Sequence, residues 1–202
     1  MVDLSFIVNT VFSSKTYIIR CNGVGDDKDC WIVDCGDVDK VLAMGLNVRG
    51  VLLTHVHYDH IYGLNRLLRS MPEATVYTNA DGYAALQNPR LNFSRYHTEA
   101  PDFILKQTNA VRIIEAEGKI KLEGGIEVEA LFTPGHTPNC ISYVVGDCLF
   151  TGDAYIPGIK VVTTFPRSNK EDAQNSLERL KALEQRGLKI QPGHELGRPA
   201  LM

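Results

Sequence analysis

The sequence predicts an α+β protein built as a four-layer αββα sandwich, in which two sheets pack face to face with helices outside. Short β-rich segments are concentrated in two halves of the chain, and segments with one apolar helical face follow each half. Glycine, proline and asparagine turns separate many of these segments. An α+β fold with a single sheet would give a similar pattern, so periodicity alone leaves that alternative open.

The size and composition are those of an ordinary globular protein. The 202 residues are enough for one domain over residues 1–202, or for two very small ones, with a sizeable core. With 44% hydrophobic and 22% charged residues, disorder and coiled coil are excluded. The net charge is −3, and no basic cluster is longer than a pair. We therefore expect a small-molecule substrate, with no nucleic acid polymer and no membrane as partner.

The cysteines and the apolar segments bear on the cellular compartment. The five cysteines are an odd number without compact spacing, which predicts reduced thiols at Cys21, Cys30, Cys35, Cys140 and Cys148. No apolar stretch is long enough to span a bilayer, and the N-terminus shows no signal peptide pattern. We expect a cytoplasmic location.

The first third of the chain alternates strands with turns. Residues 16–20 and 30–34 are β-rich and are joined by the turn-rich stretch 22–27, which predicts a hairpin. Asp37 is placed to cap a short helix. The continuous apolar run 50–54 is typical of a strand that is buried on both faces.

The next elements are a helix, a strand and a second helix. Leucines recur at helical spacing over residues 64–71, and Pro72 marks the end of that helix. Residues 74–78 predict a strand, and 80–86 a short helix capped by Asn79. Residues 88–110 then show no periodicity, which predicts a loop. The loop is long for a connection within one domain, and long loops often form the wall of a site.

The second half is predicted to be rich in strands, over residues 111–114, 119–122, 126–132, 140–145 and 148–151. The last two would form a hairpin through Gly146 and Asp147. A capping box at 168–171 then opens a helix that ends at Gly187, and a last short strand ends at Gln191.

The strongest chemical signal is the segment Thr54–His60, which lies between a buried strand and an amphipathic helix. Histidine and aspartate are costly to bury unpaired, so packing alone does not account for four of them here. His55 and His57 point to the same side while the backbone stays extended. Asp59 and His60 turn off as the helix begins and can face a second position. The spacing suits two adjacent metal ions better than one.

Three further candidates follow apolar strands in tight turns: His136 in TPGHTP, Asp153 in FTGD and His194 in QPGHE. Rigid strands that carry side chains on short loops are a common framework for a metal site. The remaining histidine, His97, lies in the long loop with no motif around it.

Taken in order, these motifs resemble those of the metallo-β-lactamase-fold hydrolases, and most of all the short glyoxalase II-like (hydroxyacylglutathione hydrolase-like) group. The resemblance runs from Val8 to near the C-terminus, and it implies an αββα sandwich with metals at one edge. The implied ligands are His55, His57 and His136 for one metal and Asp59, His60 and His194 for the other, with Asp153 bridging both. Asp34, in WIVDCG, would be a buried carboxylate behind the site.

The ligand set and the resemblance together predict a dinuclear metallohydrolase. Imidazole and carboxylate without thiolate suit two Zn²⁺ ions, and they leave Fe or Mn open. A water shared by two cations becomes a bridging hydroxide near neutral pH, and it would attack a small ester- or thioester-like substrate. Asp59 is the best candidate for the catalytic proton acceptor as well as a ligand.

Several alternatives stay open. Asp153 is similar to the bridging residue of thioester hydrolases, lactonases and nuclease-like relatives rather than to lactam-hydrolysing ones. No C-terminal helical region and no clear glutathione motif follow it, so the sequence does not decide whether the substrate contains glutathione. Lys160 and Arg167 could bind an anionic substrate. A phosphodiesterase for a small cyclic nucleotide is the alternative, because a polyanion would need a basic arm. An iron-dependent redox enzyme and a purely structural metal site are less favoured.

Overall fold

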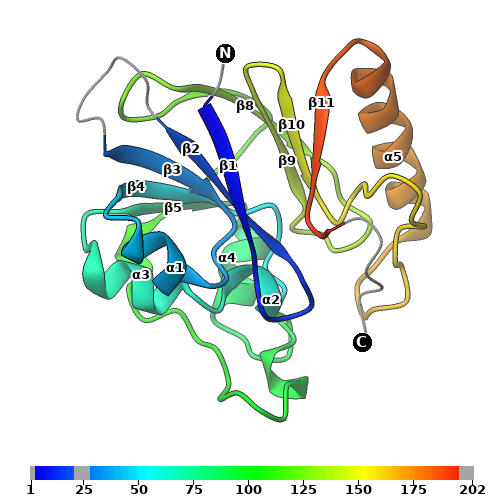
Figure 1. The fold of residues 1–202 in the computed structure, drawn as a ribbon. Coiled ribbons are helices and arrows are strands. Elements are labelled where there is room, and N and C mark those ends of the chain that lie inside the picture. Colours follow the sequence, from blue (N-terminus) through cyan, green and yellow to red (C-terminus); the bar gives the residue numbers. More distant parts are fainter. Residues whose placement is uncertain (1–2, 21–27, 196–202) are drawn as a thin grey trace.

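The structure, a computed structural model, describes residues 3–20 and 28–195, and its strands form two mixed sheets (Figure 1). The first sheet has the order β1-β2-β3-β4-β5-β6 and the second the order β11-β10-β9-β8-β7. The first sheet comprises β1 (Asp3–Val8), β2 (Lys15–Arg20), β3 (Asp29–Val33), β4 (Asn47–Leu52), β5 (Thr75–Thr78) and β6 (Val111–Ile113). The second comprises β7 (Gly118–Lys121), β8 (Glu127–Phe132), β9 (Ile141–Val145), β10 (Cys148–Gly152) and β11 (Lys189–Pro192).

The helices lie on the outer faces of the two sheets (Figure 1). They are α1 (Val38–Ala43), α2 (Tyr58–Ile61), α3 (Leu64–Ser70), α4 (Ala80–Leu86) and α5 (Lys170–Gln185), with short 3-10 turns η1 (Ser94–Tyr96) and η2 (Thr108–Ala110). Helices α1, α3 and α4 cover the first sheet, and α5 covers the second.

Alternating side chains divide the interior into three apolar layers. Ile18 and Ile32 pack against the helices below the first sheet, whereas their neighbours Tyr17 and Trp31 pack between the two sheets. On the second sheet, Leu149 faces α5. Three buried layers require four structural layers, so the predicted αββα sandwich is confirmed and the single-sheet alternative is wrong.

The first strand is the main element that the sequence analysis missed. Strand β1 pairs antiparallel with β2 at the edge of the first sheet, and none of its six residues is fully buried. An edge strand with partial exposure on both faces lacks the alternation by which strands are recognised. The expected hairpin pairing of β2 with β3 is present, while the turn 22–27 and Cys21 lie outside the described residues.

Two expected helix caps differ from the structure. Asp37 precedes α1 but makes no capping hydrogen bond, because its carboxylate instead binds Thr10, Lys40 and the hydroxyl of Tyr62. At α5 the capping side chain is Asn169, which accepts hydrogen bonds from the first turn.

Ser168, the predicted capping residue of α5, instead donates to the carbonyl of His136 at 2.6 Å. By contrast Asn79 caps α4 as expected. Sequence spacing therefore located α1 and α5. It could not show that the side chains of Asp37 and Ser168 form hydrogen bonds elsewhere instead of capping these helices.

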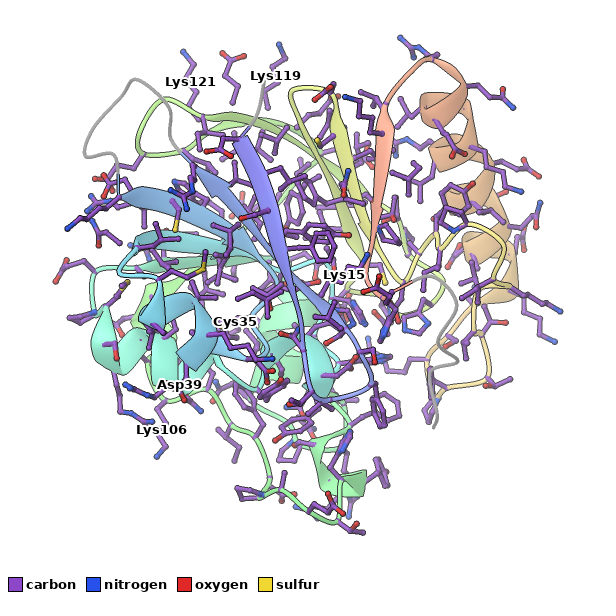
Figure 2. The ribbon with its side chains drawn as sticks, viewed as in Figure 1. Lys15, Cys35, Asp39, Lys106, Lys119 and Lys121 are labelled. Carbon is purple, nitrogen blue, oxygen red and sulfur yellow. The ribbon has the colours of Figure 1, made fainter. Side chains whose placement is uncertain are left out.

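Three of the described cysteines are buried thiols without a disulfide bond. They are Cys35, Cys140 and Cys148, and Cys35 lies between the first sheet and its helices (Figure 2). Within residues 3–20 and 28–195, no helix has the length and apolar character needed to cross a bilayer.

Candidate metal centre

All seven predicted ligand residues lie at one edge of the sandwich, where strands of both sheets end. His55 and His57 follow β4, and Asp59 and His60 lie in α2. His136 follows β8, Asp153 follows β10 and His194 follows β11. The two sheets are joined at this edge, since the amide of Ile141 donates to the carbonyl of Thr54. The site is therefore fixed by both sheets.

The ligand atoms form three overlapping groups, each with its atoms within 4.8 Å of one another: His55, His57 and His136; His55, His60 and Asp153; and Asp59, His60 and His194. Five imidazoles and two carboxylates thus meet in one place. The first and third groups match the two ligand sets that the resemblance implied.

Asp153 lies between the two outer groups. Its Oδ2 is 3.3 Å from Nε2 of His194 and 3.7 Å from Nε2 of His136. Its Oδ1 is 3.7 Å from Nε2 of His60, and Oδ2 is 4.0 Å from Nε2 of His55. One carboxylate therefore reaches histidines of both groups, as a bridging ligand must.

Backbone carbonyls orient two of the imidazoles. Nδ1 of His136 donates to the carbonyl of Val162 at 2.9 Å, and Nδ1 of His194 donates to the carbonyl of Phe12 at 3.0 Å. A carbonyl can only accept, so Nδ1 of each ring carries a proton, and Nε2, which points into the cluster, is the atom that the neutral ring offers to a metal. This is how proteins fix the tautomer of a metal-binding histidine.

Asp34 orients a third imidazole and is completely buried. Its Oδ2 lies 2.8 Å from Nδ1 of His60, and it accepts hydrogen bonds from the amide and hydroxyl of Thr54 at 2.8 and 2.7 Å. Burial raises the pKa of Asp34, while the charge and hydrogen bond of His60 act in the opposite direction. The backbone of Asp34 has φ +59°, a strained conformation for a non-glycine residue. Asp34 occupies the place behind the site that the resemblance implied.

The electrostatics of the first histidine group and of Asp153 favour a cation. Burial, and then the neighbouring His136, lowers the pKa of His57 to about 3, and burial holds the pKa of His55 well below its usual range. Both rings are therefore neutral and can donate lone pairs. Burial raises the pKa of Asp153, but the charges of nearby histidines outweigh it and hold that pKa well below its usual range. Nε2 of His55 and Oδ1 of Asp153 are buried without a hydrogen-bond partner. These residues fit a metal site.

Two glycines let the backbone approach the cluster. A Cβ at Gly193 would lie 2.3 Å from Oδ1 of Asp153. Gly152 has φ +50°, and its Cβ would lie 2.4 Å from Oγ1 of Thr54. Gly193, before His194, is therefore required by contact, and Gly152, before Asp153, by contact as well as by conformation.

Other residues of the site were missed by the sequence analysis. The side chain of Asn139 accepts from the amide of Val56 at 3.1 Å, which holds the backbone between His55 and His57. Phe12 contributes only its carbonyl to His194, and no sequence pattern reports such a contact. For Asn139, the signal available was its position three residues after His136.

A cavity of about 780 Å³ opens beside the cluster. Its walls come from the β1–β2 turn, from residues 93–99 and from residues 156–165. The expectation that the long loop walls a site is therefore met by its 93–99 part. His97 and Lys160 line the cavity, whereas Arg167 lies outside it and pairs with Asp81 at 2.6 Å.

The fold and the cluster define a class: an αββα sandwich with a histidine- and aspartate-rich metal-binding edge. Within that class, the chain belongs to the metallo-β-lactamase superfamily, whose family model matches residues 9–194. Similar proteins are named as a zinc-dependent hydrolase, a hydroxyacylglutathione hydrolase and a metallo-hydrolase, which supports a hydrolase.

Three curated relatives show the range of similarity. The chain is 26% identical over 159 residues to a probable polyketide biosynthesis zinc-dependent hydrolase, BaeB, of Bacillus velezensis, which covers 79% of this chain and 62% of the relative. It is 28% identical to a hydroxyacylglutathione hydrolase of Hydrogenovibrio crunogenus, covering 74% of this chain and 48% of that enzyme. It is 30% identical to the probable metallo-hydrolase YqgX of Bacillus subtilis, with 83% and 81% covered. The chain thus spans about half of one of the first two relatives and less than two thirds of the other.

Solved structures share the fold. The BLEG-1 B3 metallo-β-lactamase superposes with a TM-score of 0.81 at 24% identity, covering 95% of this chain and 91% of that one. TTHA1623 in a di-iron-bound form gives a TM-score of 0.75 at 24% identity, covering 95% and 92%.

Proposed function

We propose that this protein is a dinuclear metal-dependent hydrolase that acts on a small ester or thioester in the cytoplasm, with residues 1–202 as one domain. The observation that carries the proposal is Asp153, whose two oxygens reach histidines on both sides of the cluster. In the proposal, His55, His57 and His136 hold one ion, Asp59, His60 and His194 hold the other, and Asp153 bridges them.

Zinc is the proposed metal. The donor set has no thiolate and combines imidazole with carboxylate, which suits Zn²⁺. The relative from Bacillus velezensis is named as zinc-dependent, while the di-iron form of TTHA1623 keeps iron as the alternative. When bound, a metal pair supplies a water acidic enough to ionise near neutral pH and a Lewis acid for the substrate oxygen.

Asp59 is the proposed catalytic residue. Its Oδ2 lies 3.2 Å from Nε2 of His60 and 3.4 Å from Nε2 of His194, and its side chain reaches the cavity. Burial raises the pKa of Asp59, but the charges and hydrogen bond of these histidines outweigh it and hold the pKa below its usual value. The ionised carboxylate can accept a proton from the attacking water and deliver it to the leaving group.

The similarity to hydroxyacylglutathione hydrolases supports a thioester as the substrate. Both oxygen esters and thioesters present a carbonyl carbon that a water nucleophile attacks. The cavity walls, rather than the ligand residues, must then distinguish one acyl compound from another.

Hydrolysis of thioesters, lactones and phosphodiesters by the metal-loaded protein tests this proposal. We expect turnover of an ester or thioester, lost on chelation and restored by Zn²⁺. Asp59→Asn should lower kcat by about 10²-fold or more, whereas Asp39→Asn on the exposed face of α1 should leave it unchanged (Figure 2). Turnover of phosphodiesters alone, or turnover that is insensitive to chelation, would contradict the proposal.

A further inference from the structure

The cavity beside the cluster has predominantly apolar walls. Phe12 enters from the β1–β2 turn, Phe93 from the long loop, and Ile156 and Phe165 from the segment that follows Asp153. A volume of about 780 Å³ is in the range of pockets that enclose a small organic ligand. Three separate segments therefore supply apolar surface to one cavity.

Two phenylalanine rings lie directly against the candidate ligands. The Phe93 ring centroid is 4.7 Å from that of His57, and the Phe165 centroid is 5.2 Å from it. Phe165 is also 5.5 Å from His136, and the two phenylalanines are 5.0 Å apart. A substrate whose scissile carbonyl lies at the His57 and His136 side of the cluster would have an adjoining group within reach of these rings.

The fold holds Phe93 in an unfavourable conformation. Its φ is +63°, in the left-handed region that a phenylalanine rarely adopts. The buried side chain of Asn92 fixes this backbone by donating to the carbonyls of Ala85 and Phe103 and by accepting from the amide of Ser94. Strain that the surrounding structure maintains at a site is a mark of function.

Charge is scarce on the described walls of the cavity. Apart from the candidate ligands, the charged side chains among the lining residues are Glu99 and Lys160. The nearby Arg95 lies outside the lining and is paired with Asp102 at 2.9 Å. Glutathione carries two carboxylates and one ammonium group, so the described lining, with one lysine, offers fewer cations than its carboxylates would pair with.

We propose that the substrate is an ester or thioester with an apolar group, aromatic or medium-length alkyl, adjoining the scissile bond, and that Phe93 and Phe165 select for it. This inference rests on the proposed function, and it adds the class of substrate. The group packs against the two rings where they line the cavity and displaces water from the apolar walls. It can belong to the acyl part or to the leaving group, since both adjoin the reacting carbonyl.

Two substrate series test the selection. One consists of N-acetylcysteamine thioesters from acetyl to octanoyl together with phenylacetyl, and the other of acetate esters of ethanol, hexanol and benzyl alcohol. We expect kcat/KM to rise by up to about fourfold for each added methylene in at least one series. Phe165→Ala should flatten that rise, and Phe165→Leu should keep the alkyl preference but lower the preference for aromatic groups. Phe6→Ala, an exposed phenylalanine outside the cavity, is the matched control. No rise in either series would overturn the inference.

A binding measurement separates failure of this inference from failure of the proposed function. The neutral fluorophore N-phenyl-1-naphthylamine should bind the metal-loaded protein, bind about tenfold more weakly to Phe165→Ala, and bind unchanged to Phe6→Ala. Such binding without hydrolysis of any ester would support the apolar cavity and contradict the proposed function. Hydrolysis of acetyl thioesters or S-lactoylglutathione, without apolar preference and without binding of the fluorophore, would support the function and overturn the inference.

Discussion

Asp34 is not one of the candidate ligands, but it orients His60, which is one. Its carboxylate binds Thr54 and Nδ1 of His60, and it is completely buried. Loss of one acceptor would therefore leave a buried imidazole without a fixed orientation.

We predict that Asp34→Asn lowers metal affinity by about 10- to 100-fold, because His60 loses a charged partner. Elemental analysis after dialysis against a graded series of chelator concentrations measures this loss. Asp39→Asn is the control, since Asp39 is an exposed aspartate of α1 that pairs with Arg66. Equal retention of metal by the two variants would show that Asp34 has no such role.

The pKa of Asp37 leads to a prediction about how the stability of the folded protein depends on pH. Partial burial raises the pKa of Asp37, but hydrogen bonds from Lys40, Tyr62 and Thr10 outweigh it and hold the pKa below its ordinary value. A carboxyl whose pKa is lower in the folded state stabilises the protein above its unfolded pKa, and this contribution is lost as pH falls through the folded pKa.

Asp37→Asn should therefore cost about 1 kcal/mol of unfolding free energy at neutral pH. The difference from wild type should shrink below about pH 4, where the wild-type carboxyl becomes protonated. Urea unfolding at pH 7 and at successive lower pH values measures it. A difference that grows as pH falls would have the wrong sign for this account.

At the scale of elements, the structure and the sequence pattern differ in the residue that caps the long helix α5. Asn169 accepts from the amides of Glu171 and Asp172, whereas Ser168 donates to the carbonyl of His136. Asn169→Ala should destabilise the protein by about 1 kcal/mol, which lowers Tm by about 2–4 °C. Ser168→Ala should lower Tm less. The reverse order, seen by calorimetry, would support the capping box predicted from the sequence.

Elements with a local signal were predicted well. The strand that ends before His55 and the helix α4 with its cap Asn79 follow from apolar runs and a capping residue within a few positions. The seven candidate ligands also follow from local motifs, since each lies in a tight turn or helix start after a strand. Strand β1 could not be predicted in this way, because its partial exposure on both faces gives no period.

The rest of the site depends on contacts between distant parts of the chain. Phe93 and Phe165 meet across 72 positions of sequence, and Phe12 reaches His194 through a carbonyl that has no sequence signature. The long loop was expected to wall a site, but that Phe93 lines it, with its backbone in the left-handed region, has no signature in the sequence. Local patterns cannot carry that information.

For the whole molecule, the candidate metal site lies where the two sheets meet. Its candidate ligands follow β4 of the first sheet and β8, β10 and β11 of the second, so bound ions would tie the sheets together at this edge. Ions that bind the folded chain alone stabilise it by about 2.7 kcal/mol at one hundred times their dissociation constant.

Chelation should therefore lower Tm by about 5–10 °C, and added Zn²⁺ should restore it. His136→Ala should reduce this chelator-dependent shift. His97→Ala should leave the shift intact, because His97 lies outside the ligand groups and packs on Phe12 and Tyr58. Scanning calorimetry with and without chelator measures both, and a Tm that chelation leaves unchanged would contradict the account.

The central claim is that Asp153 joins two metal positions in one centre, and the metal content per chain tests it most directly. Elemental analysis of protein purified without chelators should find about two zinc ions per chain, and at most about one in Asp153→Ala. One ion per chain in the wild-type protein, or a content that does not change in Asp153→Ala, would contradict the claim.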